Sequence, residues 1–155
     1  RGLVLGHVWL PEGPSAQDSA TAAPAAGQRR GLLRLLEAPG GEILWQQERE
    51  VGLTQALYAL DDNLLLVAFD GVSLLSAADG EELWSLSGLA GIEYYRPPMR
   101  LAGLLVLGGG VPMAVDPATG QALWKYRPPG VPAASVADGL RLYVASSRGL
   151  WALRP

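Results

Sequence analysis

Few side chains of the kind that carry out catalysis occur in this sequence, and they are far apart. The chain has one histidine, His7, and no cysteine, so a thiolate nucleophile, a disulfide and a cysteine-ligated metal are excluded. His7 lies in an apolar run, where we expect a hydrogen-bonded or strand-edge side chain rather than a metal ligand or a triad base. The sequence contains no Gly-x-Ser-x-Gly turn of the hydrolase type.

Two short stretches resemble ligand-binding motifs in composition but not in context. Asp61-Asp62-Asn63 offers three oxygen-bearing side chains, yet a calcium site needs more ligands at defined spacing, and such residues are typical of turns. Gly108-Gly-Gly110 joins two apolar runs and does not open a helix, so we interpret it as a hairpin turn rather than a phosphate loop. We therefore predict no catalytic residue, no metal ligand and no cofactor.

One cluster has the composition of a binding surface. Glu93-Tyr94-Tyr95-Arg96 lies in or just before an expected strand, and tyrosine and arginine are enriched at the centres of protein interfaces. Tyr94, Tyr95 and Arg96 are therefore candidate partner-binding residues. The alternative is ordinary packing of the tyrosines with a solvated Arg96.

Composition limits the partners further. The 155 residues are 49% hydrophobic and 17% charged with a net charge of −3, which is typical of a globular domain. The longest basic run is Arg29-Arg30, so no stripe for nucleic acid or for an anionic membrane is present. The longest apolar runs, such as Leu64–Phe69, are far shorter than the roughly 20 residues of a membrane span.

A repeat organises the chain. Three segments align on their tryptophans at spacings of 39 and 40 residues: Gly41-Glu-Ile-Leu-Trp45, Gly80-Glu-Glu-Leu-Trp84 and Gly120-Gln-Ala-Leu-Trp124. A turn and a short apolar run precede each segment, and Gly, Asp and Pro punctuate runs of four to seven residues. A period near 40 with four short strands per unit predicts a β-propeller.

The predicted fold is all-β, with blades of four antiparallel strands named A to D from the inside outward. About three and a half blades fit the chain, which makes residues 1–155 one partial propeller with an incomplete ring. We assign blade 1 to 1–50 with a low-complexity surface insertion at 12–30, blade 2 to 51–90, blade 3 to 91–129, and a partial blade 4 to 130–155. Strand A of blade 3 is expected within Ile92–Arg96 or slightly later.

The stretch Ala114-Val-Asp-Pro-Ala-Thr-Gly-Gln-Ala-Leu-Trp124 resembles the tryptophan-docking motif of quinoprotein-type (PQQ-like) propellers. The motif is Ala-x-Asp-x-x-Thr-Gly, three residues, then Trp. Blade 3 matches it at every defined position: Ala114, Asp116, Thr119, Gly120 and Trp124. Blade 2 retains Gly80 and Trp84 but has Leu74, Ser76 and Asp79 at the other positions, and blade 1 retains Gly41 and Trp45.

The resemblance implies structural roles for these residues. In the family the turn reverses the chain between strands C and D, and the tryptophan ring is wedged between neighbouring blades. We accordingly predict that Trp45, Trp84 and Trp124, with Gly41, Gly80 and Gly120, are docking residues rather than ligand contacts.

The resemblance leaves the activity open. The family includes quinone-cofactor dehydrogenases and cofactor-free scaffolds such as the outer-membrane-protein assembly lipoprotein. We favour a non-enzymatic, protein-binding scaffold with an unknown protein partner. The alternatives are part of a PQQ-dependent dehydrogenase or a ligand-sensing ectodomain. The family also implies an extracytoplasmic location. Because three and a half blades do not close a ring, we expect flanking sequence of a longer parent, or alternatively a homo-oligomer, to complete it.

Overall fold

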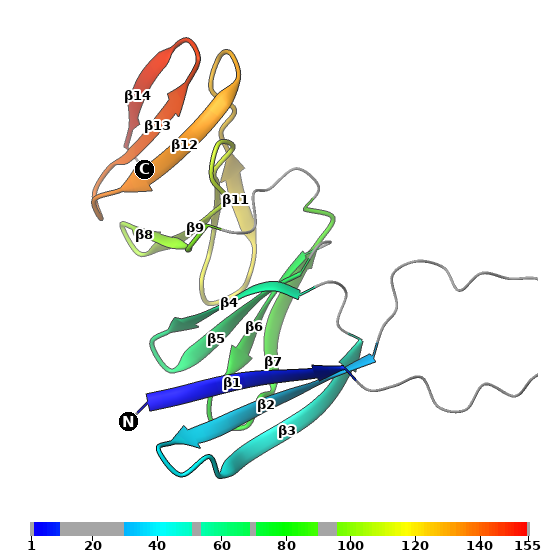
Figure 1. The fold of residues 1–155 in the computed structure, drawn as a ribbon. Helices are drawn as coiled ribbons and strands as arrows, with labels where there is room; N and C mark the ends of the chain where they lie inside the picture. Colours follow the sequence, from blue (N-terminus) through cyan, green and yellow to red (C-terminus); the bar gives the residue numbers. More distant parts are fainter. Residues whose placement is uncertain (1, 10–29, 51–53, 69–70, 90–95, 155) are drawn as a thin grey trace, which may run out of the picture.

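The structure is a computed structural model that describes residues 2–9, 30–50, 54–68, 71–89 and 96–154. The insertion predicted at 12–30 lies outside these residues except for Arg30. Short strands fill the described part, and no helix occurs in it (Figure 1). No helix of the described chain is therefore long and apolar enough to cross a membrane.

In the described residues, fourteen strands form four antiparallel sheets that follow one another along the chain (Figure 1). The first sheet contains β1 (Gly2–Trp9), β2 (Arg30–Ala38) and β3 (Ile43–Glu50). The second contains β4 (Thr54–Leu60), β5 (Asn63–Ala68), β6 (Gly71–Ser76) and β7 (Glu82–Ser87). The third contains β8 (Met99–Leu101), β9 (Leu104–Leu107), β10 (Met113–Val115) and β11 (Ala122–Lys125). The fourth contains β12 (Pro132–Ala137), β13 (Leu142–Ser146) and β14 (Gly149–Leu153).

This arrangement confirms the predicted all-β fold of propeller blades that do not close into a ring. In every sheet the strands pair in chain order, which is the up-and-down pattern of a blade. The second and third sheets have all four strands, A to D. By correspondence with them, β1–β3 are strands B to D of blade 1, and β12–β14 are strands A to C of blade 4.

The inner strand of blade 3 was expected within Ile92–Arg96 or slightly later, and the described strand takes the later position. It is β8, which starts at Met99. Pro97 and Pro98 intervene, and because proline has no backbone N–H it cannot donate to a neighbouring strand. Ile92 to Tyr95 lie outside the described residues, and Arg96 occupies a bend before the strand.

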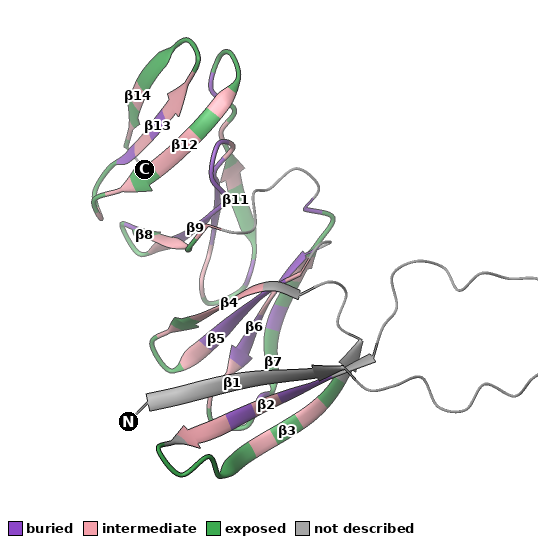
Figure 2. Cartoon of the chain, viewed as in Figure 1, coloured by how far each residue is buried: buried purple, intermediate pink, exposed green. Residues whose placement is uncertain are grey.

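The apolar core lies between consecutive sheets rather than inside one central volume. Side chains alternate across a strand, so Leu64 and Leu66 of β5 pack toward blade 1, whereas Leu65 and Val67 pack toward blade 3. This two-sided burial explains why β5 and β9, the B strands of blades 2 and 3, are rich in apolar residues on both faces. Figure 2 shows the buried residues concentrated in the middle strands and exposed residues along the outer ones.

The turns between strands A and B and those between strands C and D emerge at the same end of the blades, because successive strands are antiparallel. In blade 2 a backbone hydrogen bond of 3.1 Å from the amide of Ala77 to the carbonyl of Asp62 joins the two turns directly. We call this end, formed by residues 37–42, 61–62, 76–81, 102–103, 116–121 and 138–141, the turn end.

Candidate functional site: the turn end of the blades

The C-to-D turn has the same backbone geometry in blades 1, 2 and 3. The amide of the fifth residue donates to the carbonyl of the first at 2.7 Å in Gly41–Glu37, 2.9 Å in Gly80–Ser76 and 2.9 Å in Gly120–Asp116. The fifth residue has a φ of +74°, +79° and +73° respectively. This left-handed conformation is accessible to glycine without the steric cost that a Cβ brings.

Each of these turns is followed by a β-bulge in strand D. In all three blades, two consecutive residues of strand C pair with residues of strand D that are two positions apart. Strand D therefore has one extra residue at this point, where the pairing register shifts. The extra residue lies immediately before the tryptophan and is Leu44, Leu83 or Leu123, each with a side chain about half exposed. The bulge sets the side to which the following indole points.

Side-chain hydrogen bonds hold the turn of blade 3. Oδ1 of Asp116 accepts the amide of Ala118 at 2.8 Å, and Oγ1 of Thr119 accepts the amide of Gln121 at 3.3 Å. These are the short polar side chain to backbone bonds that stabilise turns. They satisfy amides that the C-to-D ladder does not pair.

Blade 2 makes the same two bonds with different residues. Oγ of Ser76 accepts the amide of Ala78 at 3.3 Å, and Oδ1 of Asp79 accepts the amide of Glu81 at 3.1 Å. Ser76 stands where blade 3 has an aspartate, and Asp79 where it has a threonine. The departure of blade 2 from the motif therefore preserves the acceptor at both positions.

The indole of Trp84 lies against the turn of the following blade. Its Nε1 donates to the carbonyl of Pro117 at 2.9 Å, and the residue is 7% exposed. A Cβ built on Gly120 would lie 2.6 Å from Cδ2 of Trp84, so the ring covers the place where any other residue would carry its side chain.

Trp45 repeats this arrangement one blade earlier. Its Nε1 donates to the carbonyl of Ala77 at 3.0 Å, and a Cβ on Gly80 would lie 2.8 Å from Cζ3 of the ring. A further bond of 3.3 Å runs from the side-chain amide of Gln47 to the carbonyl of Asp79. Blade 1 and blade 2 are thus joined through the same turn positions as blades 2 and 3.

The third tryptophan has a different setting within the described residues. Trp124 is half-buried and packs against the apolar cluster between blades 3 and 4, which includes Leu142 and Val144. It pairs with Ala114, which is fully buried. No fourth C-to-D turn lies among the described residues, so Trp124 as a docking residue stays a prediction.

Of the tyrosine–arginine cluster, the structure describes only Arg96. Tyr94 and Tyr95 lie outside the described residues. Arg96 is half-buried at the connection between blades 2 and 3, before Pro97. Partner binding by these three residues stays a prediction. His7 lies on β1 and pairs with Leu33 of β2.

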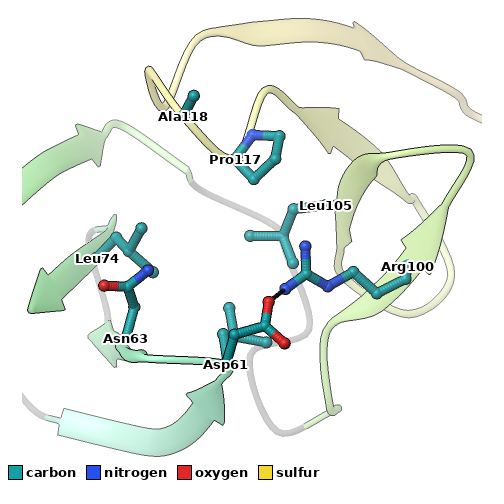
Figure 3. A pocket seen from close by; sticks show the side chains of 8 residues that line it. Asp61, Asn63, Leu74, Arg100, Leu105, Pro117 and Ala118 are labelled. Atoms are coloured by element: carbon teal, nitrogen blue, oxygen red, sulfur yellow. Dashed lines mark hydrogen bonds and ion pairs between the residues drawn. The ribbon is translucent and has the colours of Figure 1, made fainter. Parts of the chain in front are cut away.

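A cavity of about 250 Å³ lies at the turn end between blades 2 and 3 (Figure 3). Its lining comes from four separate parts of the chain, so no local sequence pattern reveals it. The lining residues are Leu60, Asp61, Asn63, Leu74, Arg100, Leu105, Pro117 and Ala118. The carbonyl of Pro117 also accepts the Trp84 indole N–H, so the cavity adjoins the Trp84 side chain.

An ion pair between Asp61 of blade 2 and Arg100 of blade 3 stands beside this cavity (Figure 3). The two side chains are 80% and 48% exposed, and ion pairs this open to water contribute about 0–1 kcal/mol to stability. Asp61 has a φ of +53°, in the left-handed region that aspartate tolerates better than most residues. The pair is therefore more informative about the surface charge than about stability.

Carboxylates dominate the turn end. Within its turns the only cation is Arg141, and Arg100 lies on β8, two residues before the turn at 102–103. The carboxylates are Glu37, Glu42, Asp61, Asp62, Asp79, Glu81, Asp116 and Asp138. Arg127 and Arg148 lie at the opposite end of the blades. Within the described chain, no group of three or more His, Cys, Asp or Glu side chains is placed to hold a metal ion.

Two of these carboxylates bind protons more weakly than free aspartate does. The backbone amide of Leu140, and then that of Arg141, lower the pKa of Asp138 below its ordinary 3.8, and the Tyr143 hydroxyl adds to this effect. The pKa of Asp79 is lowered in the same way, first by the amide of Glu81 and then by the Ser76 hydroxyl. Both carboxylates are therefore ionised at neutral pH.

The lowered pKa of Asp138 predicts an acid-dependent loss of stability. Because the folded state favours the ionised carboxylate, its contribution is complete above pH about 4 and is lost as pH falls through the lower folded pKa. Asp138→Asn is expected to destabilise the protein at pH 7 and to have less effect near pH 2.5. Urea denaturation at both pH values measures this, and a carboxyl that titrates in NMR at or above 3.8 would contradict it.

Comparison with known proteins gives the same repeat family. A family model described as "Outer membrane protein assembly factor BamB" matches residues 29–149. The solved structure of BamB from Moraxella catarrhalis is 18% identical with a TM-score of 0.58, and the match covers 83% of this chain and 46% of that one. This chain thus spans a little under half the length of that BamB.

Two computationally designed proteins share the fold. Ika8 is 18% identical with a TM-score of 0.60, over 86% of this chain and 44% of its own. Ika4 is 19% identical with a TM-score of 0.53, over 90% of this chain and 95% of its own. At these identities the likeness concerns the fold alone. No curated protein sequence matches the chain.

Proposed function

Because this chain belongs to the family described as outer membrane protein assembly factor BamB, a family of PQQ-like β-propeller repeats, we propose that it is a non-enzymatic scaffold that binds another protein. The observation that carries this proposal is that the polar groups of the tryptophan-docking motif are engaged in hydrogen bonds within the protein. Its indole N–H groups and turn side chains bond to backbone of the same or the next blade. The two indoles join neighbouring blades and the turn side chains stabilise their own turns, which supports a structural role for the motif.

The apolar core supports the same function. Within the residues whose burial is described, no polar or charged side chain is buried. A quinone dehydrogenase must hold its cofactor with several convergent polar groups, and such groups are typically enclosed by protein. The turn end is an exposed, acidic surface, which suits contact with a macromolecule. By analogy with the family's name, we propose an extracytoplasmic location.

A quinone-reconstitution assay tests the proposal against the dehydrogenase alternative. The purified protein is incubated with pyrroloquinoline quinone and calcium, and reduction of an artificial dye is followed with primary alcohols as substrates. We expect no dye reduction above that of quinone alone and no shift of the quinone absorbance. Alcohol-dependent turnover would overturn the non-enzymatic function.

Partner binding requires a separate measurement. A tagged form of the chain is cross-linked in its host, and each recovered protein is purified and tested by biolayer interferometry. We expect at least one partner to bind saturably and to recover this chain in the reciprocal experiment. If every recovered protein fails to bind when purified, the scaffold function is contradicted.

A further inference from the structure

We infer that the cavity between blades 2 and 3 is an anchor pocket that receives one apolar side chain from a basic segment of a partner protein. The inference rests on the proposed scaffold function and adds where the partner binds and what chemistry it presents. It is carried by the shape of the cavity, the apolar side chains that line it and the charge around its mouth (Figure 3).

Polar and apolar side chains share the lining of the cavity, and Asn63 is one of the polar ones. Leu74 and Leu105 are 5% and 1% exposed, and with Leu60 and the ring of Pro117 they form a hydrophobic wall. A volume of about 250 Å³ holds one large side chain and is below the roughly 300–1,000 Å³ of sites for drug-sized molecules. An anchor of Phe, Trp or Leu type therefore fits the space better than a whole cofactor does.

The mouth of the cavity is polar and carries charge. Asp61 and Arg100 stand at one side as an exposed pair, and Ala118 at the other side is also exposed. The corresponding positions at the boundary between blades 3 and 4 are Ala102, after the inner strand, and Val136, one residue before its end. A charged mouth is thus a property of this boundary and is not required by the repeat.

The charge around the mouth selects the partner. Besides Asp61, the carboxylates of Asp62, Asp79, Glu81 and Asp116 belong to the adjacent turns, and Arg100 is already paired. Complementary charge steers association and suppresses partners of like charge. Lysine or arginine residues flanking the apolar anchor would meet these carboxylates, whereas an acidic segment would be repelled.

A peptide titration tests the inference directly. The probe is the pentapeptide acetyl-Lys-Lys-Phe-Lys-Lys-amide, followed by NMR shifts of the leucine methyl groups. We expect saturable shifts at Leu60, Leu74 and Leu105 that weaken as salt is raised. The matched peptides with Gly in place of Phe, or Glu in place of Lys, are expected to bind at least about tenfold more weakly. Equal binding by either matched peptide, or shifts confined to other leucines, would overturn the inference.

Two variants at equivalent turn positions distinguish binding of the peptide in the cavity from non-specific binding elsewhere on the surface. Ala118→Phe places a ring at the cavity mouth, whereas Ala78→Phe makes the same change at the matching position of blade 2, which does not line the cavity. Both alanines are exposed, so neither change is expected to unfold the protein. We expect Ala118→Phe to raise the dissociation constant of the probe by about tenfold or more and Ala78→Phe to leave it unchanged.

Two further results separate this inference from the proposed function. If N-acetylphenylalanine amide binds as tightly as the pentapeptide, the cavity is a small-molecule site and the basic partner is wrong. If the protein partner recovered by cross-linking binds Ala118→Phe and wild type equally well, the scaffold function stands and the anchor pocket is wrong. Quinone-dependent turnover would contradict the scaffold function whatever the peptides do.

Discussion

Trp84→Ala is expected to lower the free energy of unfolding by about 3–5 kcal/mol, the largest effect among the substitutions that we propose. The indole is 7% exposed and belongs to the apolar cluster between blades 2 and 3, so truncation leaves a cavity at that boundary. The carbonyl of Pro117 also loses its indole donor. Chemical denaturation, with the midpoint and the m-value both measured, gives the change.

Two further variants, one at the adjacent residue and one at Trp84 itself, show which interactions account for the lost free energy of unfolding. Leu83→Ala changes the half-exposed residue next to Trp84 and is expected to cost less than about 1 kcal/mol. Trp84→Phe keeps an aromatic ring but removes the N–H donor, and an intermediate loss is expected. An unchanged midpoint for Trp84→Ala would contradict interblade docking as the source of stability.

Gly120→Ala is expected to cost about 2–5 kcal/mol, the second largest effect. The backbone has a φ of +73°, which a Cβ disfavours, and the new Cβ would lie 2.6 Å from Cδ2 of the Trp84 ring. Either the indole or the turn must move. The same denaturation measurement detects the loss, and a shift of the tryptophan fluorescence is expected to accompany it.

Gly41→Ala is the matched control, because it isolates the backbone strain. Gly41 has nearly the same φ, +74°, and stands at the same position of its turn, but no atom lies within 4 Å of a Cβ built there. It is expected to cost about 1–2 kcal/mol. If Gly41→Ala and Gly120→Ala destabilise equally, the contact with the indole has no energetic role.

The strand positions were largely predictable because the turn residues that separate the strands can be recognised in the local sequence. Glycines such as Gly80 and Gly120 occupy left-handed positions that other residues avoid, and each recurs about 40 residues after the last, with a tryptophan four residues later. The inner strand of blade 3 was predicted less closely, within Ile92–Arg96 or slightly later. The described strand β8 begins at Met99, directly after Pro97 and Pro98, which have no backbone N–H to donate to a neighbouring strand.

The site was less predictable than the fold, for two physical reasons. A sequence motif is defined by residue types, whereas the turn requires only a side-chain hydrogen-bond acceptor at each of two positions. Ser76 and Asp79 were therefore mismatches to the motif, although they make the same bonds as Asp116 and Thr119. The cavity depends on contacts between segments tens of residues apart. No local pattern encodes the distance between Asp61 and Arg100.

The direction of the indole bonds has a consequence for biosynthesis. Trp45 and Trp84 each bond to a carbonyl later in the chain, 32 and 33 residues downstream. During translation a blade can therefore have all its own strands paired while its indole still lacks the carbonyl acceptor, which belongs to the next blade. The blades are then stabilised one after another from the N-terminus, and the most recently synthesised blade is the one most exposed to chaperones and proteases.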